Sequence, residues 1–349
     1  MGLARCGWDV EHGVELLEGR QEFVITFSTI LQAVLPIYFL VMLGVVLRKI
    51  RILTPETDAG LFKMVVHCFY PCLILDKTLS NDLVRQPGVV AWGIALGFGI
   101  VVCGFLIAGL VGRGIGLQKG TGMRTFGLSA GIQNYGYMAI PLLLVLFAGE
   151  KTLGVLFVHS LGVELALWGV GLMILAGGMK GSLKALINGP IVAVVLGLGL
   201  AYSGGWQFFE PGEDGGPFVG QILRQSISWC GAAAVPLGLM LIGAVMFDFA
   251  LKERPSLKIG FGALLVRVVL IPAGILCLAR YLPVVIELKQ VLVVQAAMPA
   301  AVTPVILARN YGGSPGVAVQ VVLATSIAAL VTTPLIVSIG LRFVFGAGS

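Results

Sequence analysis

Long apolar runs that carry almost no charge recur along this sequence, and they limit the fold more than any other feature. Only 11% of the 349 residues are Asp, Glu, Lys or Arg, while 58% are hydrophobic before the 49 glycines are counted. A soluble domain has about 25% charged residues and must cover its surface with polar groups. This chain has too few polar residues for that, so the lipid bilayer is its solvent.

Ten runs are long enough to cross a bilayer, since a membrane-spanning helix takes about 20 apolar residues. The predicted fold is an all-α polytopic membrane protein with short connections, preceded by an extramembrane segment at 1–26 that lacks the apolar core of a secretory signal. The predicted spans cover residues 27–47, 59–79, 88–111, 123–148, 152–176, 189–204, 219–247, 257–281, 285–308 and 315–345.

Basic residues favour one side of these spans. The connections after spans 1, 3, 5, 7 and 9, with the adjoining span ends, hold 13 Lys and Arg, the opposite side holds 9, and Arg267 lies inside a span. By the positive-inside rule, the first side is cytoplasmic. We therefore expect a multi-pass protein of the cell (cytoplasmic) membrane, with both termini and the acidic loop at 210–216 outside.

Several other classes of protein are disfavoured by the sequence. The net charge of +6 comes from scattered residues and not from a basic stripe with aromatics, so it does not indicate a nucleic-acid partner. There is no H-E-x-x-H or Walker A motif, and of the cysteines only Cys68 and Cys72 are closely spaced, which packing on an apolar helix explains. We therefore expect no metal and no bound cofactor.

Four prolines indicate an internal repeat. Pro71 and Pro236 lie in the second span of each half, and Pro141 and Pro304 lie in the fourth, with offsets of 165 and 163 residues. A duplicated unit of five spans, an odd number, places its second copy upside down in the membrane, as in many secondary transporters. The alternative is a set of unrelated proline kinks. The predicted division is a first repeat at 27–176, a cytoplasmic linker at 177–188 and a second repeat at 189–345.

The fourth and ninth spans are predicted to be broken helices. In the fourth, Pro141 has no amide hydrogen and crowds the carbonyl four residues earlier, beside a cluster of Gly, Gln and Asn. The ninth span contains Pro299 and Pro304 with Thr303 between them. Two broken helices at equivalent places bring half-helix N-termini together near the midplane, where their dipoles favour an anion.

Asn134 is the strongest candidate for binding that anion, because its amide can donate two hydrogen bonds to a carboxylate without the cost of burying a cation. The alternative is a hydrogen bond between neighbouring helices. The full predicted substrate site comprises Gln133, Asn134, Tyr135, Pro141, Pro299, Thr303 and Pro304.

Three stretches carry a family resemblance. NYGYMAIPLL at 134–143 resembles the Asn-x-x-x-x-x-Ile-Pro-Leu segment of the auxin efflux carrier family, and MPAAVTPVILARNYGG at 298–313 resembles that family's second crossover. The opening LQAVLPIYFLVMLGVVLRK at 31–49 resembles it as well, so the resemblance covers nearly the whole chain after residue 25.

The resemblance implies ten helices in two inverted five-helix repeats and a fold related to the bile acid/sodium symporter-like transporters. Helices 1, 2, 6 and 7 would form a scaffold and helices 3–5 and 8–10 a transport domain, which carries organic anions by an elevator-type motion. It also implies a homodimer through the scaffold and a substrate-binding role for Asn134. The short connection at 177–188 is similar to that of the compact prokaryotic members, which are associated with malate, malonate and other carboxylates as well as auxin-like compounds.

The resemblance has a departure at the second crossover. Ala300 and Ala301 stand where polar residues occur in the family, so this half of the site is expected to offer only its backbone.

Two ionisable residues lie deep in the predicted spans, where charge is expensive and therefore suggests function. Glu164 is in span 5 and Arg267 in span 8. We expect them to form a structural ion pair, with the alternative that Glu164 carries a coupling proton; coupling to H⁺ or Na⁺ is left open.

Two other functions compete with transport of an organic anion. GLSAG at 127–131 fits the G-x-S-x-G pattern of hydrolases, which would make Ser129 a nucleophile and His159 its base, although that motif belongs to a strand-to-helix turn. An anion channel could be lined by the same broken helices.

Overall fold

The computed structural model describes residues 27–79, 81–118, 120–147, 150–176, 188–210, 216–250 and 255–346. The predicted extramembrane segment at 1–26, nearly all of the linker at 177–188 and most of the acidic loop at 210–216 lie outside the described residues.

The first half of the described chain consists of helices joined by short loops. Its elements are α1 (Phe27–Lys49), α2 (Pro55–Met64), a π-helical turn (Val65–Phe69), α3 (Tyr70–Leu79), a 3₁₀ turn (Asp82–Arg85), α4 (Pro87–Gly114), α5 (Thr121–Gly131), α6 (Ala139–Leu146), α7 (Glu150–Leu165), a second π-helical turn (Ala166–Gly171) and α8 (Leu172–Ala176).

The second half follows the same plan. Its elements are α10 (Gly189–Ser203), a 3₁₀ turn (Gly205–Phe209), α11 (Phe218–Ala232), α12 (Ala234–Ala250), α13 (Leu257–Leu264), a third π-helical turn (Leu265–Leu270), α14 (Ile271–Tyr281), α15 (Ile286–Ala297), α16 (Thr303–Asn310) and α17 (Pro315–Phe345). No described residue belongs to a β-strand; one isolated bridge joins Gln133 to Ala300.

Within the described residues, seven helical segments are long and apolar enough to cross a membrane, and they correspond to predicted spans 1, 2, 3, 5, 7, 8 and 10. The other three predicted spans contain shorter helices. α10 has 15 residues, while spans 4 and 9 are each divided in two by an unwound stretch. The chain is thus an all-helical, multi-pass membrane protein, and both predicted helix breaks are present.

Helix ends follow local sequence signals. Thr54 precedes Pro55 at the start of α2, and its hydroxyl accepts a hydrogen bond from the amide of Thr57 at 3.3 Å. Asn188 caps α10 in the same way, accepting from the Ile191 amide at 3.0 Å. At the other end of α10, Gly204 adopts a φ of 78°, the left-handed conformation that glycine tolerates at a helix C-terminus.

Prolines inside the spans are accommodated by local changes in the helix. Pro71 and Pro272 each follow a π-helical turn, at 65–69 and 265–270, and the kink at Ala233 comes three residues before Pro236. Proline lacks an amide hydrogen and its ring clashes with the preceding turn, so the helix widens or bends there.

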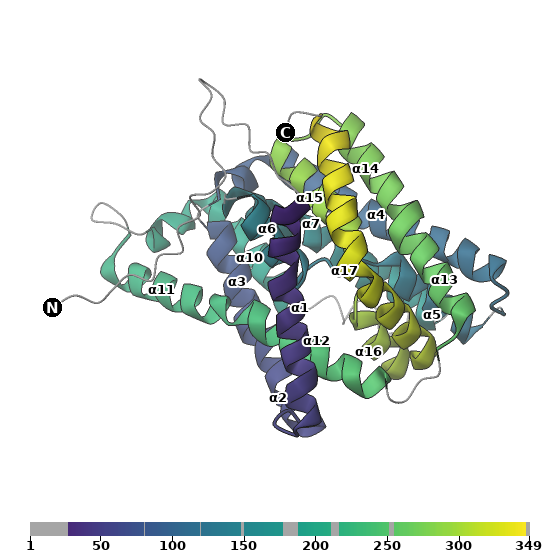
Figure 1. Cartoon of the computed structure of the whole chain (residues 1–349). Helices are drawn as coiled ribbons and strands as arrows, with labels where there is room; N and C mark the ends of the chain where they lie inside the picture. The colour runs from purple at the N-terminus through teal and green to yellow at the C-terminus, as the bar shows by residue number, and fades with distance from the viewer. Residues whose placement is uncertain are drawn as a thin grey trace.

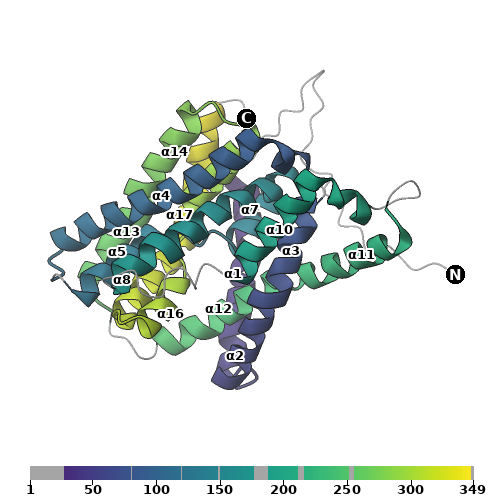
Figure 2. The same cartoon turned by 180° about the vertical axis from the view of Figure 1, so that it is seen from behind.

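Close helix packing relies on glycine. α1 runs along α12, where a side chain on Gly44 or Gly243 would overlap the backbone of the other helix. α4 packs on both α5 and α7, and a Cβ atom on Gly131 would lie 2.7 Å from the backbone carbon of Gly104. α11 reaches away from the rest of the molecule, and α13, α14 and α17 lie together on the opposite side (Figure 1). From behind, α4 is seen to run alongside α7 (Figure 2).

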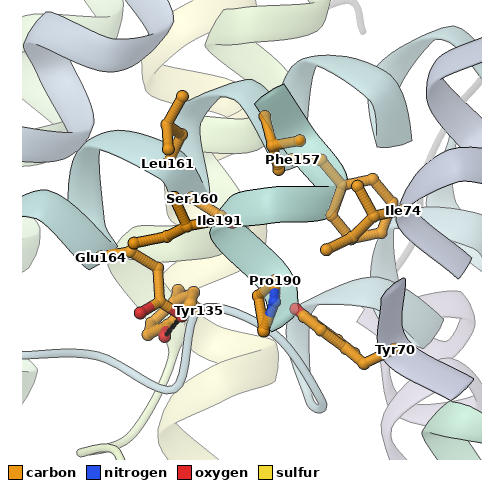
Figure 3. Close-up of a pocket in the computed structure, with 10 residues that line it drawn as sticks. Tyr70, Ile74, Tyr135, Phe157, Ser160, Leu161, Glu164, Pro190 and Ile191 are labelled. Carbon is orange, nitrogen blue, oxygen red and sulfur yellow. Dashed lines mark hydrogen bonds between the residues drawn. The ribbon is translucent and has the colours of Figure 1, made fainter. Parts of the chain in front are cut away.

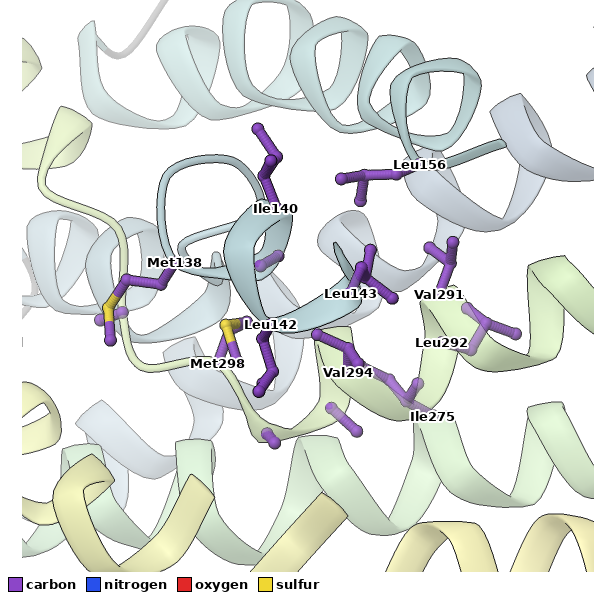
Figure 4. Packing of buried hydrophobic residues seen from close by; sticks show 14 of the residues in the cluster. Met138, Ile140, Leu142, Leu143, Leu156, Ile275, Val291, Leu292, Val294 and Met298 are labelled. Carbon is purple, nitrogen blue, oxygen red and sulfur yellow. The ribbon is translucent and has the colours of Figure 1, made fainter. Parts of the chain in front are cut away.

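The short helix α6 lies in the middle of the core. Ile140, Leu142 and Leu143 are fully buried and pack with residues of α7, α14 and α15 (Figure 4). In a bilayer, van der Waals contacts between closely packed side chains stabilise such a core, because lipid tails are as apolar as leucine. Apolar packing therefore fixes the position of the half-helix that follows the first break.

Candidate substrate site

The two unwound stretches, 132–138 and 298–302, cross and pair through their backbones. The backbone amide of Asn134 donates to the Pro299 carbonyl at 2.7 Å, and the backbone amide of Ala301 donates to the Ile132 carbonyl at 3.1 Å. These two bonds flank the antiparallel bridge between Gln133 and Ala300. We call this paired region the crossover. It satisfies backbone groups that would otherwise be stranded at membrane depth.

This pairing places Gln133 and Asn134, both predicted to bind the substrate, on opposite faces of the crossover. Successive side chains of an extended segment point to opposite faces, so Gln133 and Asn134 face away from each other. The side chain of Gln133 is fully buried and its amide has no hydrogen bond within the described residues. Asn134 is 7% exposed, and its side chain likewise forms no hydrogen bond to any part of the chain that the structure describes. The side-chain amide of Asn134, unlike its backbone amide, is thus free to bind a ligand.

Two half-helices begin at the crossover, and neither N-terminus has a side-chain cap. α6 begins at Ala139 with Pro141 in its first turn, and α16 begins at Thr303 with Pro304. A proline costs no hydrogen bond in the first helical turn, where amide groups have no intrahelical partner. The predicted prolines therefore mark where the half-helices start, and they leave two positive dipole ends near the crossover.

The second crossover segment, Met298–Val302, has no polar side chain and is held by polar groups of neighbouring helices. Arg267 donates to the Met298 carbonyl at 2.7 Å, and the Ala300 amide donates to the Thr325 hydroxyl at 3.2 Å. Thr333 donates to the carbonyl of Ala297, the last residue of α15, at 3.0 Å. That this half offers a substrate only its backbone stays a prediction.

Glu164 and Arg267 do not form the predicted ion pair. Glu164 accepts hydrogen bonds from the Tyr135 hydroxyl at 2.5 Å and from the Trp168 indole at 2.6 Å. Arg267 bonds the Met298 carbonyl instead. The prediction was wrong because each group finds a nearer partner: Trp168 lies one helical turn after Glu164, and the crossover brings a backbone carbonyl to Arg267.

A small cavity adjoins the first crossover segment. Tyr135 and Glu164 line it together with Tyr70, Pro190 and Ile191 (Figure 3). Its volume is about 10 Å³, which is about enough for one water molecule. A cavity of this size has no room for a molecule much larger than water.

Aromatic rings of neighbouring helices pack against the first crossover segment. The rings of Tyr70 and Tyr137 are 5.4 Å apart. Gly136 and Gly238 leave the space that these rings occupy, because a Cβ atom on Gly136 would lie 2.6 Å from the Tyr70 hydroxyl and one on Gly238 would overlap Tyr137. The segment 132–138 is therefore in contact with α3 and α12 as well as with its own neighbours.

The arrangement required by the hydrolase hypothesis is not present. Ser129 lies within α5, which is helical and not part of a strand-to-helix turn. Ser129 and His159 are both fully buried, and neither side chain has a hydrogen-bond partner among the described residues. A serine nucleophile needs a base within hydrogen-bond reach. Gly131, at the end of the GLSAG motif, serves instead to bring α5 close to α4.

Sequence reasoning missed several residues of this region. Gln295 donates to the Tyr135 carbonyl at 3.0 Å, and Thr325 and Thr333 of α17 support the second segment. Trp168 was detectable, since it follows Glu164 by four residues on one helix face. The threonines had no such signal, because a hydroxyl in a transmembrane helix usually bonds its own preceding turn.

The fold and this site define a multi-pass membrane protein built around two broken helices that cross. A model of the membrane transport protein family matches residues 29–184 and 173–337, which together make up most of the sequence. The chain therefore belongs to the membrane transport protein family, which includes the auxin efflux carriers. A search of curated proteins finds no match. This is a family of transporters and not of enzymes, which agrees with the sequence prediction.

Proposed function

We propose that the protein is a secondary transporter of small organic anions, with its substrate site at the crossover and Asn134 as the main donor to a carboxylate. The observation that carries the proposal is that two uncapped half-helix N-termini lie beside a segment in which the side-chain amide of Asn134 has no partner within the described chain. Helix N-termini and amide donors both favour a negative group.

The order of the helices supports two five-helix repeats. The five segments of the first half begin at Phe27, Pro55, Pro87, Thr121 and Glu150, and those of the second half begin at Gly189, Phe218, Leu257, Ile286 and Pro315. Matching starts are 162 to 170 residues apart. The antiparallel bridge at the crossover is what an inverted second copy requires, since equivalent segments then meet with opposite chain directions.

Helix packing supports a division into two parts that could move against each other. α1 packs on α12 and α3 packs on α10, and the repeat relation exchanges these two pairs. α4 to α8 and α13 to α17 make most of their contacts with one another. In our proposal the first group is the scaffold and the second the transport domain of an elevator, and the small cavity at Tyr70 and Glu164 lies between them.

Glu164 is our candidate for coupling to H⁺, with Na⁺ as the alternative ion. Its carboxyl group lines the cavity between the two proposed domains, where domain motion would change its exposure. In proteoliposomes, Glu164→Gln should still exchange substrate but no longer respond to a pH gradient, since an amide cannot release a proton. A response to a pH gradient that matches the wild type would remove Glu164 from this role.

The central experiment measures binding of mono- and dicarboxylates to the purified protein by thermal shift, followed by uptake into proteoliposomes. A ligand that binds the folded state raises its stability, so at least one carboxylate should raise the melting temperature and be taken up with saturation. Absence of any shift across the panel would refute the proposed substrate class. Flux that does not saturate would favour the channel hypothesis.

Orientation, localisation and assembly are separate proposals. We propose that the protein lies in the cytoplasmic membrane as a homodimer, with both termini outside. Single cysteines introduced at 205–216 should then be labelled from outside and those at 178–188 from inside. Reversed labelling would refute the orientation. Cross-linking in the membrane tests the dimer.

A further inference from the structure

Arg267 differs from the other buried cations of the described chain. Its side chain is only 2% exposed, and its Nε and Nη1 atoms have no partner within the described residues. Arg48, at 7% exposure, pairs with Asp58 and with Asp248 instead. A buried cation that lacks a carboxylate is costly, so it needs a negative group from another source.

The local fold directs Arg267 to the crossover. It lies in the π-helical turn at 265–270, which widens the helix just before Pro272. Such turns are frequent at functional sites because they displace a side chain from the regular helix surface. Nη2 donates to the Met298 carbonyl at 2.7 Å, which places the guanidinium one residue from Pro299, the hydrogen-bond partner of Asn134.

Dipoles around the crossover add to this charge. The C-terminal end of α15, a negative dipole end, is covered by Thr333 at Ala297 and by Arg267 at Met298. The N-terminal ends of α6 and α16, which are positive, have no side-chain cap. Glu164, the nearest buried acid on the first crossover side, already accepts two hydrogen bonds. The negative groups near the crossover, Glu164 and the end of α15, therefore already have donors, whereas two positive helix ends and two nitrogens of Arg267 have no side-chain partner within the described residues.

From this geometry we infer that Arg267 supplies the fixed positive charge that makes the crossover select a carboxylate over a neutral group of the same shape. Asn134 donates to the substrate, and Arg267 acts beside it as a specificity-determining residue. The inference rests on the proposed function, since it assigns the charge selectivity of that same site. An amide such as Asn134 binds neutral and anionic oxygens alike, whereas a buried guanidinium distinguishes them.

The test compares each acid with its amide in the full-length protein. Indole-3-acetate is paired with indole-3-acetamide, and succinate with succinamide. The Kd of each is measured by calorimetry for the wild type, Arg267→Gln, Arg267→Lys and the control Arg280→Gln. Arg280 belongs to the same predicted span and also donates to a backbone carbonyl, that of Val344 at 3.0 Å, but it is exposed.

The wild type should prefer the acid, and Arg267→Gln should lose roughly tenfold to a hundredfold of acid affinity with little change for the amide. Arg267→Lys should keep part of the preference for the acid over the amide, and Arg280→Gln should keep all of that preference. A folded Arg267→Gln with the wild-type ratio of acid to amide affinity would overturn the inference alone. If Arg267→Gln does not fold, the test rests on Arg267→Lys, which keeps a positive charge. Loss of all preference for the acid over the amide in Arg267→Lys would then contradict the inference. A wild type that binds neither these acids nor any panel carboxylate would overturn the proposed function as well.

Discussion

The two segments that meet at the crossover differ in what they contribute. The first, 132–138, carries the polar side chains Gln133, Asn134 and Tyr135, and the side-chain amide of Asn134 forms no hydrogen bond with any described residue. The second, Met298–Val302, carries none, and polar groups of other helices hold its backbone. The two segments thus differ in structure: the first keeps a side-chain amide without a partner in the described chain, and the second is anchored by neighbouring helices; in our proposal only the first presents side chains to the ligand.

This difference has a physical basis. An extended segment at membrane depth must have all its backbone groups satisfied, and the bridge between Gln133 and Ala300 satisfies some of both segments at once. Arg267, Thr325 and neighbouring helices anchor the second segment, and its backbone hydrogen bonds to the first segment hold that segment in place as well. Side chains of the first segment are then available for recognition.

The largest effect on binding is expected from Asn134→Ala. Loss of a hydrogen bond to a carboxylate costs about 1.5–3 kcal/mol, so affinity for the transported acid should fall roughly tenfold to a hundredfold. Calorimetry on the folded variant measures this. Asn310→Ala, at the exposed end of α16, is the matched control and should bind as the wild type does. Unchanged affinity in Asn134→Ala would leave this residue with a packing role.

A substitution that weakens the anchoring of the second segment should lower the stability of the protein more than its affinity for substrate. Thr333→Val keeps the shape of the side chain but removes its hydrogen bond to the Ala297 carbonyl, which should lower the free energy of unfolding by about 0.5–1.5 kcal/mol. A fall in the melting temperature at nearly constant Kd is the expected pattern. Thr332→Val is the control, because the hydroxyl of Thr332 has no hydrogen-bond partner within the described chain. An equal loss of affinity in Thr333→Val and Asn134→Ala would show that the two segments do not differ as we describe.

Glu164 and Arg267 should behave independently, since each has its own partners. In a double-mutant cycle with Glu164→Gln and Arg267→Gln, the effects on stability should add to within about 0.5 kcal/mol. An ion pair would instead make the double variant less destabilised than the sum of the single ones, because a stranded charge is then removed. Thermal unfolding of all four proteins distinguishes these results, and strong coupling would restore the predicted pair.

The smallest effect is expected from Ser129→Ala. Ser129 is buried, and its hydroxyl has no partner in the described part of the chain, so replacing it removes no hydrogen bond. Uptake should stay within about twofold of the wild type, a change of less than 0.5 kcal/mol. Measured uptake in proteoliposomes checks this. A hydrolytic activity that disappears in this variant would revive the enzyme hypothesis.

The sequence by itself determined the solvent, the helical class and the two breaks. A chain with few charges and long apolar runs can fold only with the bilayer as its solvent. A proline removes a backbone hydrogen bond whatever surrounds it, so Pro141 and Pro304 located the starts of the half-helices. These are local consequences of residue type. They do not depend on which helices become neighbours.

Only the tertiary structure decided which polar groups meet. The partners of Glu164 and Arg267 depend on where the unwound segments cross, and the nearest groups there are a tyrosine hydroxyl, an indole and a backbone carbonyl. The separation of Gln133 from Asn134 likewise arises from an antiparallel bridge to a residue far along the chain. Hydrogen bonds are short and directional. Two opposite charges in the sequence therefore form an ion pair only if packing brings them together, and here packing brings other donors and acceptors nearer to each of them.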